Sequence, residues 1–230
     1  TSDASGVEAW AMSPDSYIRN SLKVVEGYMD VDSVPMKKAT CPFHHANYHP
    51  ELEDTALLGP AMIARYQQLI GILRWGCELG RLDILHEVAL MSTFNAAPRQ
   101  GHLDAVYHIF SYLKSSGPRC LFFDPTEPVF DVEFNDDQEW KEFYEIEEEP
   151  TPSDMPKPRG KKVVMTCWVD ASHASNKLTM RSHTGIFIKL NGAPIAWYSK
   201  RQNTVESSTF GSEFVALRVA TEMSQALRYK

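Results

Sequence analysis

A stretch near the end of the chain constrains its fold most, because three short apolar runs there are followed by one helical pattern. The first run, Val163–Val169, is rich in β-branched residues, which favour a strand. Two more runs, Thr184–Leu190 and Ala193–Tyr198, flank the dipeptide Asn191-Gly192. That dipeptide is typical of a tight hairpin, because both residues tolerate positive φ. The stretch therefore predicts three strands, the last two joined as a hairpin, and then a helix.

The helix of this stretch begins at Ser208 or Thr209, either of which can cap its N-terminus, and continues to the chain end. Glu213 falls in register with the apolar residues that should pack on the sheet, Ala216, Leu217 and Ala220. A carboxylate at the head of an apolar stripe is costly unless it is paired or binds a metal. Asp170 ends the first strand, where open sheets expose side chains to ligands. The two acids fit a Mg²⁺ site, although exposed acids are also common at strand ends and helix starts.

The charge of the chain is unevenly divided. Its 230 residues are 43% apolar, enough for a core and for one or two domains. The net charge is −7, of which residues 1–123 carry −3, residues 124–154 carry −12 and residues 157–230 carry +8. The last block is therefore basic, as expected of a unit that contacts phosphates, and one acidic insert sets the overall sign.

Several polar residues of the basic block are candidates for contacts with nucleic acid. Four bases lie in or beside the predicted hairpin: Arg181, Lys189, Lys200 and Arg201. Ser208 and Thr209 lie at the predicted helix N-terminus, where free backbone N–H groups favour anions. Any single one of these residues is equally compatible with an ordinary polar surface. His173 and His183 flank the two acids, and exposed or structural histidines are the favoured interpretation of both.

The first 123 residues predict a small bundle of antiparallel helices with short connections. Ser13-Pro14 is typical of a helix start and Gly80 of a helix stop. The predicted elements are helices from Pro14 to about Glu26, from Pro60 to the stop at Gly80, Leu82–Phe94 and Gly101–Lys114, then strands at Leu121–Phe123 and Val129–Phe130. Bases of these helices could follow a nucleic-acid backbone or form a solvated face: Arg65, Arg74, Arg81, Arg99 and Lys114.

Residues 124–160 are acidic and then rich in proline, which predicts an extended linker. We therefore expect a helical region over 1–123, a linker over 124–160 and a mixed-sheet domain over 161–230.

Four residues of an irregular loop, Cys41, His44, His45 and His49, allow a zinc hypothesis, but no second cysteine pair completes a closed site and a plain loop is favoured. The four widely spaced cysteines predict reduced, mostly buried thiols in an intracellular protein. No apolar run reaches the length of a membrane span.

Several of these segments resemble one family in order. The segments VDASHASN, RSHTGIFIKLNGAPIAWYSKRQ and ESSTFGSEFVAL resemble the RNase H domain of copia-type LTR retrotransposon polyproteins. Upstream, YHPELEDTALLGP, RYQQLIGILRW, APRQGHLDAVYHIFSYLK and FDPTEPVFD look like the thumb and connection region that follows the reverse transcriptase palm. The resemblance covers most of the chain. It implies an α+β or α/β fold class, with an N-terminal helical bundle followed by a truncated RNase H-like mixed-sheet domain of three strands and a helix.

The resemblance also implies an activity and a site. RNase H cleaves the RNA strand of RNA–DNA hybrids with two divalent ions, Mg²⁺ or Mn²⁺, that activate water and stabilise the leaving oxygen. By resemblance Asp170 would bridge the ions and Glu213 would bind one of them. The implied partners are an RNA–DNA hybrid or template–primer and the remainder of the polyprotein. The implied location is the cytoplasm, a virus-like particle or the nucleus.

The chain departs from the family pattern. The family carries further acids on a fourth strand and on a later helix, and these acids are missing from the sequence, which ends at Lys230. The polymerase palm is missing as well. We therefore expect a fragment of a longer protein, with no polymerase activity and weak or no nuclease activity. The alternatives are a catalytically inactive fragment that binds nucleic acid or a retroelement remnant, and a transposase or integrase core, against which the helical region argues.

Overall fold

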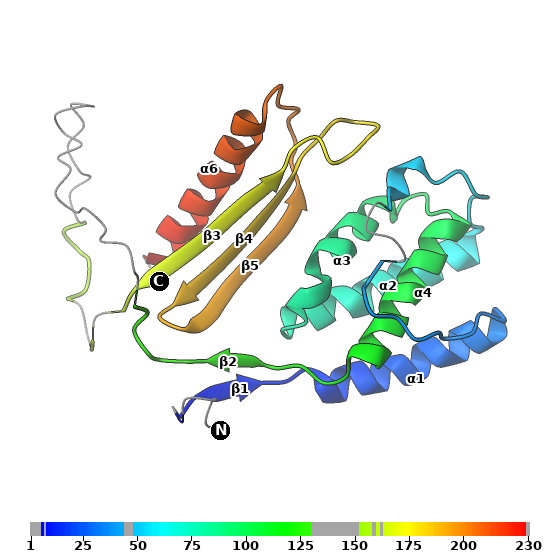
Figure 1. The fold of residues 1–230 in the computed structure, drawn as a ribbon, viewed down its shortest axis with the longest axis horizontal. Helices are drawn as coiled ribbons and strands as arrows, with labels where there is room; N and C mark the ends of the chain where they lie inside the picture. The colour runs from blue at the N-terminus through cyan, green and yellow to red at the C-terminus, as the bar shows by residue number, and fades with distance from the viewer. Residues whose placement is uncertain are drawn as a thin grey trace.

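The computed structural model describes residues 6, 8–43, 48–129, 152–157, 160–161 and 163–228. These residues form a helical part and a sheet part that lie beside each other (Figure 1). The helical part contains α1 (Asp15–Val31), α2 (Pro60–Glu78), α3 (Leu85–Met91) and α4 (Gln100–Ser116), with 3-10 turns at Pro50–Leu52, Leu82–Ile84 and Ser92–Phe94. The sheet part contains β3 (Met165–Ser172), β4 (His183–Leu190), β5 (Ala193–Arg201) and α6 (Thr209–Arg228).

The main core lies between the helices of the helical part. It is built from apolar side chains of all four helices, including Val25, Leu73, Val88 and Phe110, each of which is almost completely buried. Tyr66 lies in the same core, and its hydroxyl donates a hydrogen bond of 2.8 Å to the carbonyl oxygen of Met91. The burial of such residues at helical spacing is the main source of stability of this part.

The predicted helices are present, with one clear difference in their bounds. The prediction ended the first helix at Glu26, but α1 continues through Gly27 to Val31. The reason is tertiary, because Asp32 at its C-terminus binds Arg65 of α2 at 2.7 Å and accepts a hydrogen bond of 2.7 Å from Tyr107 of α4. The stop predicted at Gly80 is confirmed, since Gly80 adopts φ +109° just after α2.

A second, two-stranded sheet joins the two ends of the helical part. Its strands β1 (Trp10–Met12) and β2 (Leu121–Phe123) pair antiparallel, with Trp10 opposite Phe123. The sequence predicted β2 but missed its partner β1, because three residues carry too little pattern to identify a strand. The strand predicted at Val129–Phe130 is not formed at Val129, and Phe130 lies outside the described residues.

The predicted hairpin is confirmed in the three-stranded sheet. The strands pair antiparallel in the order β3-β4-β5, and Asn191 in the turn between β4 and β5 has φ +50°. β3 is shifted along the chain relative to the prediction: it begins at Met165 rather than Val163, and it pairs past Asp170 as far as Ser172, opposite His183. Asp170 is therefore inside the strand, opposite Gly185.

Helix α6 covers one face of the sheet, on which it buries a small apolar cluster around Ile186, Ile188 and Ala220. The predicted cap is confirmed, since Ser208 Oγ accepts a hydrogen bond of 3.1 Å from the backbone N–H of Gly211. The predicted apolar stripe is rotated, however. Its buried positions are Ser212, Ala216 and Ala220, whereas Leu217 is exposed and Glu213 lies half-buried at the margin.

The prediction of mostly buried cysteines is wrong. Cys41, Cys120 and Cys167 are exposed, and Cys77 is buried in the helical core. All four are free thiols. Exposure of Cys167 follows from its place on β3, the strand whose outer edge is unpaired among the described residues. Of the loop residues considered for zinc, His44 and His45 lie outside the described residues.

The helical part and the sheet part are in contact. His86 of α3 stacks edge-on against His183 of β4, with ring centroids 4.6 Å apart. The turn of the hairpin also binds the chain just after β2, since the Asn191 side chain donates a hydrogen bond of 2.9 Å to the carbonyl oxygen of Pro125. Residues 124–126 of the predicted linker thus lie against the hairpin, whereas its residues 130–151 lie outside the described residues.

Candidate functional site

The carboxyl end of β3 and the first turn of α6 lie at the same end of the sheet (Figure 1). A side-chain hydrogen bond of 3.3 Å joins Ser212 Oγ to His173 Nδ1 and holds the two segments together. Ser212 precedes Glu213, and His173 follows Asp170 by three residues. The structure therefore brings the segments of both predicted acids to one place, as the sequence order strand, strand, strand, helix requires.

The side chains of the two acids leave the backbone in different directions. Val169 packs into the apolar cluster under α6, so the alternation of a strand turns Asp170 to the other face of the sheet. There Asp170 lines a cavity together with Trp168, Phe187 and His86. Asp170 is exposed and Glu213 is half-buried on the helix margin.

The fit of these residues to a divalent cation is partial. Mg²⁺ prefers carboxylate oxygens as ligands. The segments of the two acids, Asp170 and Glu213, lie at one end of the sheet. Over the part of the chain that the structure describes, however, no three His, Cys, Asp or Glu side chains gather in a group able to hold a metal ion. The metal site at Asp170 and Glu213 thus remains a prediction.

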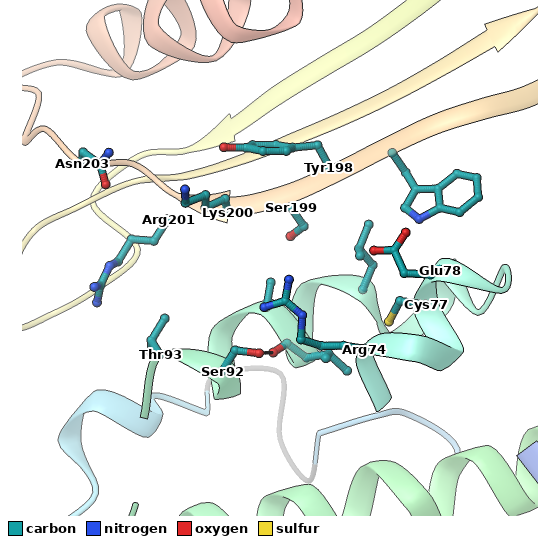
Figure 2. Close-up of a pocket in the computed structure, with 14 residues that line it drawn as sticks. Arg74, Cys77, Glu78, Ser92, Thr93, Tyr198, Ser199, Lys200, Arg201 and Asn203 are labelled. Atoms are coloured by element: carbon teal, nitrogen blue, oxygen red, sulfur yellow. Dashed lines mark hydrogen bonds between the residues drawn. The ribbon is translucent and has the colours of Figure 1, made fainter. Parts of the chain in front are cut away.

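The predicted phosphate contacts are brought together in part. Lys200 and Arg201 of β5 line a cleft of about 520 Å³ between the sheet and the helices α2 and α3 (Figure 2). Arg74 of α2 extends into the same cleft from the opposite side, and Glu78 places one carboxylate there. The cleft is also lined by the polar residues Ser92, Thr93, Ser199 and Asn203. The hydroxyls of Ser92 and Thr93 already donate hydrogen bonds to the carbonyl oxygens of Val88 and Leu90, at 2.6 and 2.7 Å.

The other residues predicted to contact nucleic acid have different surroundings. Arg181, Ser208 and Thr209 do not line this cleft. Of the five helical bases, four have partners inside the protein, which favours a structural role: Arg65 with Asp32, Arg81 with Asp83, Arg99 with the carbonyl oxygens of Asp54 and Thr55, and Lys114 with Glu26. Arg74, the fifth helical base, lines the cleft.

A second cavity, of about 690 Å³, lies beside the first on the sheet face that α6 does not cover. It is lined mainly by apolar and aromatic side chains, with Leu85 of α3 on one side and Trp168, Phe187 and Trp197 of the sheet on the other. Sequence reasoning missed this cavity. The sequence does contain a signal for this cavity. The hairpin register and the alternation of side chains along a strand put aromatic residues of neighbouring strands on the same face of the sheet.

His183, one of the two flanking histidines, is a buried structural residue. It is 6% exposed, and its Nε2 lies 2.8 Å from Ser199 Oγ. Burial, the neighbouring His86 and Arg201 together lower the pKa of His183 to about 4. Its imidazole is therefore neutral at neutral pH and ties β4 to β5, which confirms the structural interpretation of this residue.

Comparisons with known proteins find distant relatives, two of which are named as transposon proteins. The chain is 25% identical over 162 residues to a retrovirus-related Pol polyprotein from transposon TNT 1-94 of Nicotiana tabacum, a match that covers 70% of this chain and 9% of that protein. It is 26% identical over 139 residues to a putative transposon Ty5-1 protein of Saccharomyces cerevisiae, over 60% of this chain and 34% of that protein. It is also 24% identical over 157 residues to secreted RxLR effector protein 161 of Plasmopara viticola, over 68% of this chain and 87% of that protein.

The tobacco and yeast matches support the predicted similarity to a retrotransposon polyprotein. The chain spans about a tenth of the tobacco relative and about a third of the yeast relative. No family model and no solved structure matches the chain. Among the described residues, we find no helix with the length and apolar character that crossing a membrane requires.

Proposed function

We propose that this chain is a segment of a copia-type Pol polyprotein whose β3–α6 unit is of the RNase H type and binds RNA–DNA hybrids. The observation that supports this proposal best is the position of α6, whose first turn contacts the carboxyl end of β3 through Ser212 and His173. Asp170 lines the cavity next to the basic cleft, on the face opposite to α6, and Glu213 lies in the first turn of α6. The similarity to transposon polyproteins supports the same origin.

In this proposal the cleft residues Arg74 and Arg201 contact phosphates of one strand, whereas the side chain of Lys200, which alternates with Arg201 along β5, projects from the other face of the sheet. Arg201 and Arg74 reach into the cleft from β5 and α2, so a backbone lying between them would meet positive charge from both sides. The side-chain amide of Asn203 can donate a hydrogen bond to the same phosphates. The single opposing carboxylate, Glu78, leaves the lining positive overall.

The resemblance assigns Mg²⁺ or Mn²⁺ to Asp170 and Glu213, but the two side chains lie on different faces of the sheet, so the pair does not fit one cation site in this arrangement. When bound, such a cation supplies a Lewis acid and an activated water. Two acids are fewer than the ligand set that the resemblance implies, and Asp170 faces away from α6. We therefore expect the 230-residue chain to bind hybrids without cleaving them.

The test measures binding and cleavage of a labelled RNA–DNA hybrid by the same protein. Arg201→Gln is expected to weaken binding and to lower the slope of log affinity against log salt by about 0.9, because one phosphate contact is lost. The matched control is Arg218→Gln on α6, whose side chain is exposed and outside the cleft. Equal effects of the two changes would contradict the assignment of the cleft.

The cleavage assay separates an enzyme from a binding unit. With Mg²⁺ or Mn²⁺ added, we expect no release of RNA fragments from the hybrid. Strong cleavage that is lost in Asp170→Asn would show an active nuclease and overturn the binding-only expectation. An absence of hybrid binding at low salt would overturn the proposed function itself.

A further inference from the structure

Three aromatic side chains lie in one row across the sheet. Trp168 of β3 is directly opposite Phe187 of β4, and Phe187 is directly opposite Trp197 of β5. Residues that pair directly across neighbouring strands project from the same face. The rings of Trp168 and Phe187 have centroids 5.9 Å apart and are inclined by 39°. The row therefore forms a continuous aromatic surface on the face that α6 leaves uncovered.

The Trp168 end of this aromatic row is open and lies next to positive charge. Trp168 is 50% exposed, whereas Phe187 and Trp197 are half-buried. The ammonium group of Lys189 lies 5.5 Å from the ring centroid of Trp168 and 5.7 Å from that of Phe187. At the other end of the row, Trp197 lines both the aromatic cavity and the basic cleft that holds Arg74 and Arg201.

We propose that the aromatic row is a stacking platform for the unpaired bases of single-stranded nucleic acid. Every base has a flat π-face, so stacking on Trp and Phe rings is independent of sequence. Lys189, beside Trp168 and Phe187, and the basic cleft, beside Trp197, supply cations for the phosphates, and Asp170 and Glu78 are the nearby acids. An apolar partner would not need cations along the row, whereas a nucleic-acid strand does.

The platform is distinct from a hybrid-binding surface. Bases within a duplex are stacked on one another and cannot lie flat on the rings, so a hybrid can use only the cations. Loss of the platform should therefore weaken binding of a single strand and leave hybrid binding nearly unchanged. This difference separates failure of this inference from failure of the proposed function.

The experiment compares the full chain with Trp168→Ala, Trp168→Phe and Trp75→Ala by fluorescence anisotropy of labelled oligothymidylate. Trp75 is 55% exposed on α2 and lines neither cavity, so it is a matched control. We expect Trp168→Ala to lower the affinity by about 5- to 100-fold, the range found when a stacking ring is removed, and Trp168→Phe to restore most of it. A hybrid of equal length, measured in parallel, should show little change.

Three results would overturn the inference. The first is no binding of oligothymidylate by the unaltered chain at low salt. The second is an equal loss of affinity in Trp75→Ala and Trp168→Ala. The third is a dimer in size-exclusion chromatography that Trp168→Ala converts to a monomer while oligothymidylate affinity stays unchanged, because the row would then be a contact between two copies.

Discussion

His183 should make the stability of the protein depend on pH in the mildly acidic range. Its imidazole is enclosed between the sheet and α3, where it contacts His86 and hydrogen-bonds with Ser199. Burial first, then the nearby His86 and Arg201, lower its pKa from the ordinary 6.5 to about 4. The folded protein therefore binds this proton much less readily than the unfolded chain does.

The sign and size of the effect follow from this difference. Between about pH 4 and 6.5 the unfolded chain holds the proton and the folded protein does not, so acidification favours unfolding. The contribution of neutral His183 is complete above pH 6.5 and is lost as the pH falls to about 4. The full loss corresponds to about 3 kcal/mol of the free energy of unfolding.

The assay is urea unfolding, followed by tryptophan fluorescence at several pH values across this window. Because carboxylates also titrate there, the informative quantity is the difference between the unaltered chain and His183→Gln. We expect the unaltered chain to lose about 3 kcal/mol more of its free energy of unfolding across this window than His183→Gln does, whereas His49→Gln, at an imidazole that is 35% exposed, should follow the unaltered chain. Parallel pH curves for the unaltered chain and His183→Gln would refute the reasoning.

Two further changes test the helical part. Arg81 is 1% exposed and binds Asp83 through two hydrogen bonds of 2.9 and 2.8 Å. Arg81→Ala should lower the free energy of unfolding by about 3–5 kcal/mol, because it leaves the carboxylate of Asp83 without its main partner. The control is Arg19→Ala on the exposed face of α1, and similar urea midpoints for the two variants would contradict the prediction. Gly80→Ala should cost about 1–3 kcal/mol, since φ is +109° and a Cβ would lie 2.9 Å from Leu121 Cγ. A melting temperature equal to that of the unaltered chain would show that the turn after α2 relaxes freely.

Part of the candidate site could be predicted from the sequence and part could not. The order of the strands and the capped helix placed the segments of Asp170 and Glu213 at one end of a sheet, and the structure has them there. The direction of Asp170 depended on which residues of β3 pack under α6, and Val169 does. A strand with apolar residues on both faces, such as Val163–Val169, does not reveal which face will be covered.

The sequence by itself determined the local elements. Asn191-Gly192 fixed the hairpin, Ser208 fixed the start of α6, and Pro60 and Gly80 fixed the ends of α2, because each acts through backbone geometry within a few residues. Only the tertiary structure decided the contacts between distant segments. The pairing of β1 with β2, the hydrogen bond of 2.7 Å from Arg81 to Ser116 of α4, and the placing of Arg74 opposite Arg201 join residues far apart in the chain. Such contacts depend on how the helical part packs against the sheet, and no short pattern in the sequence encodes that packing.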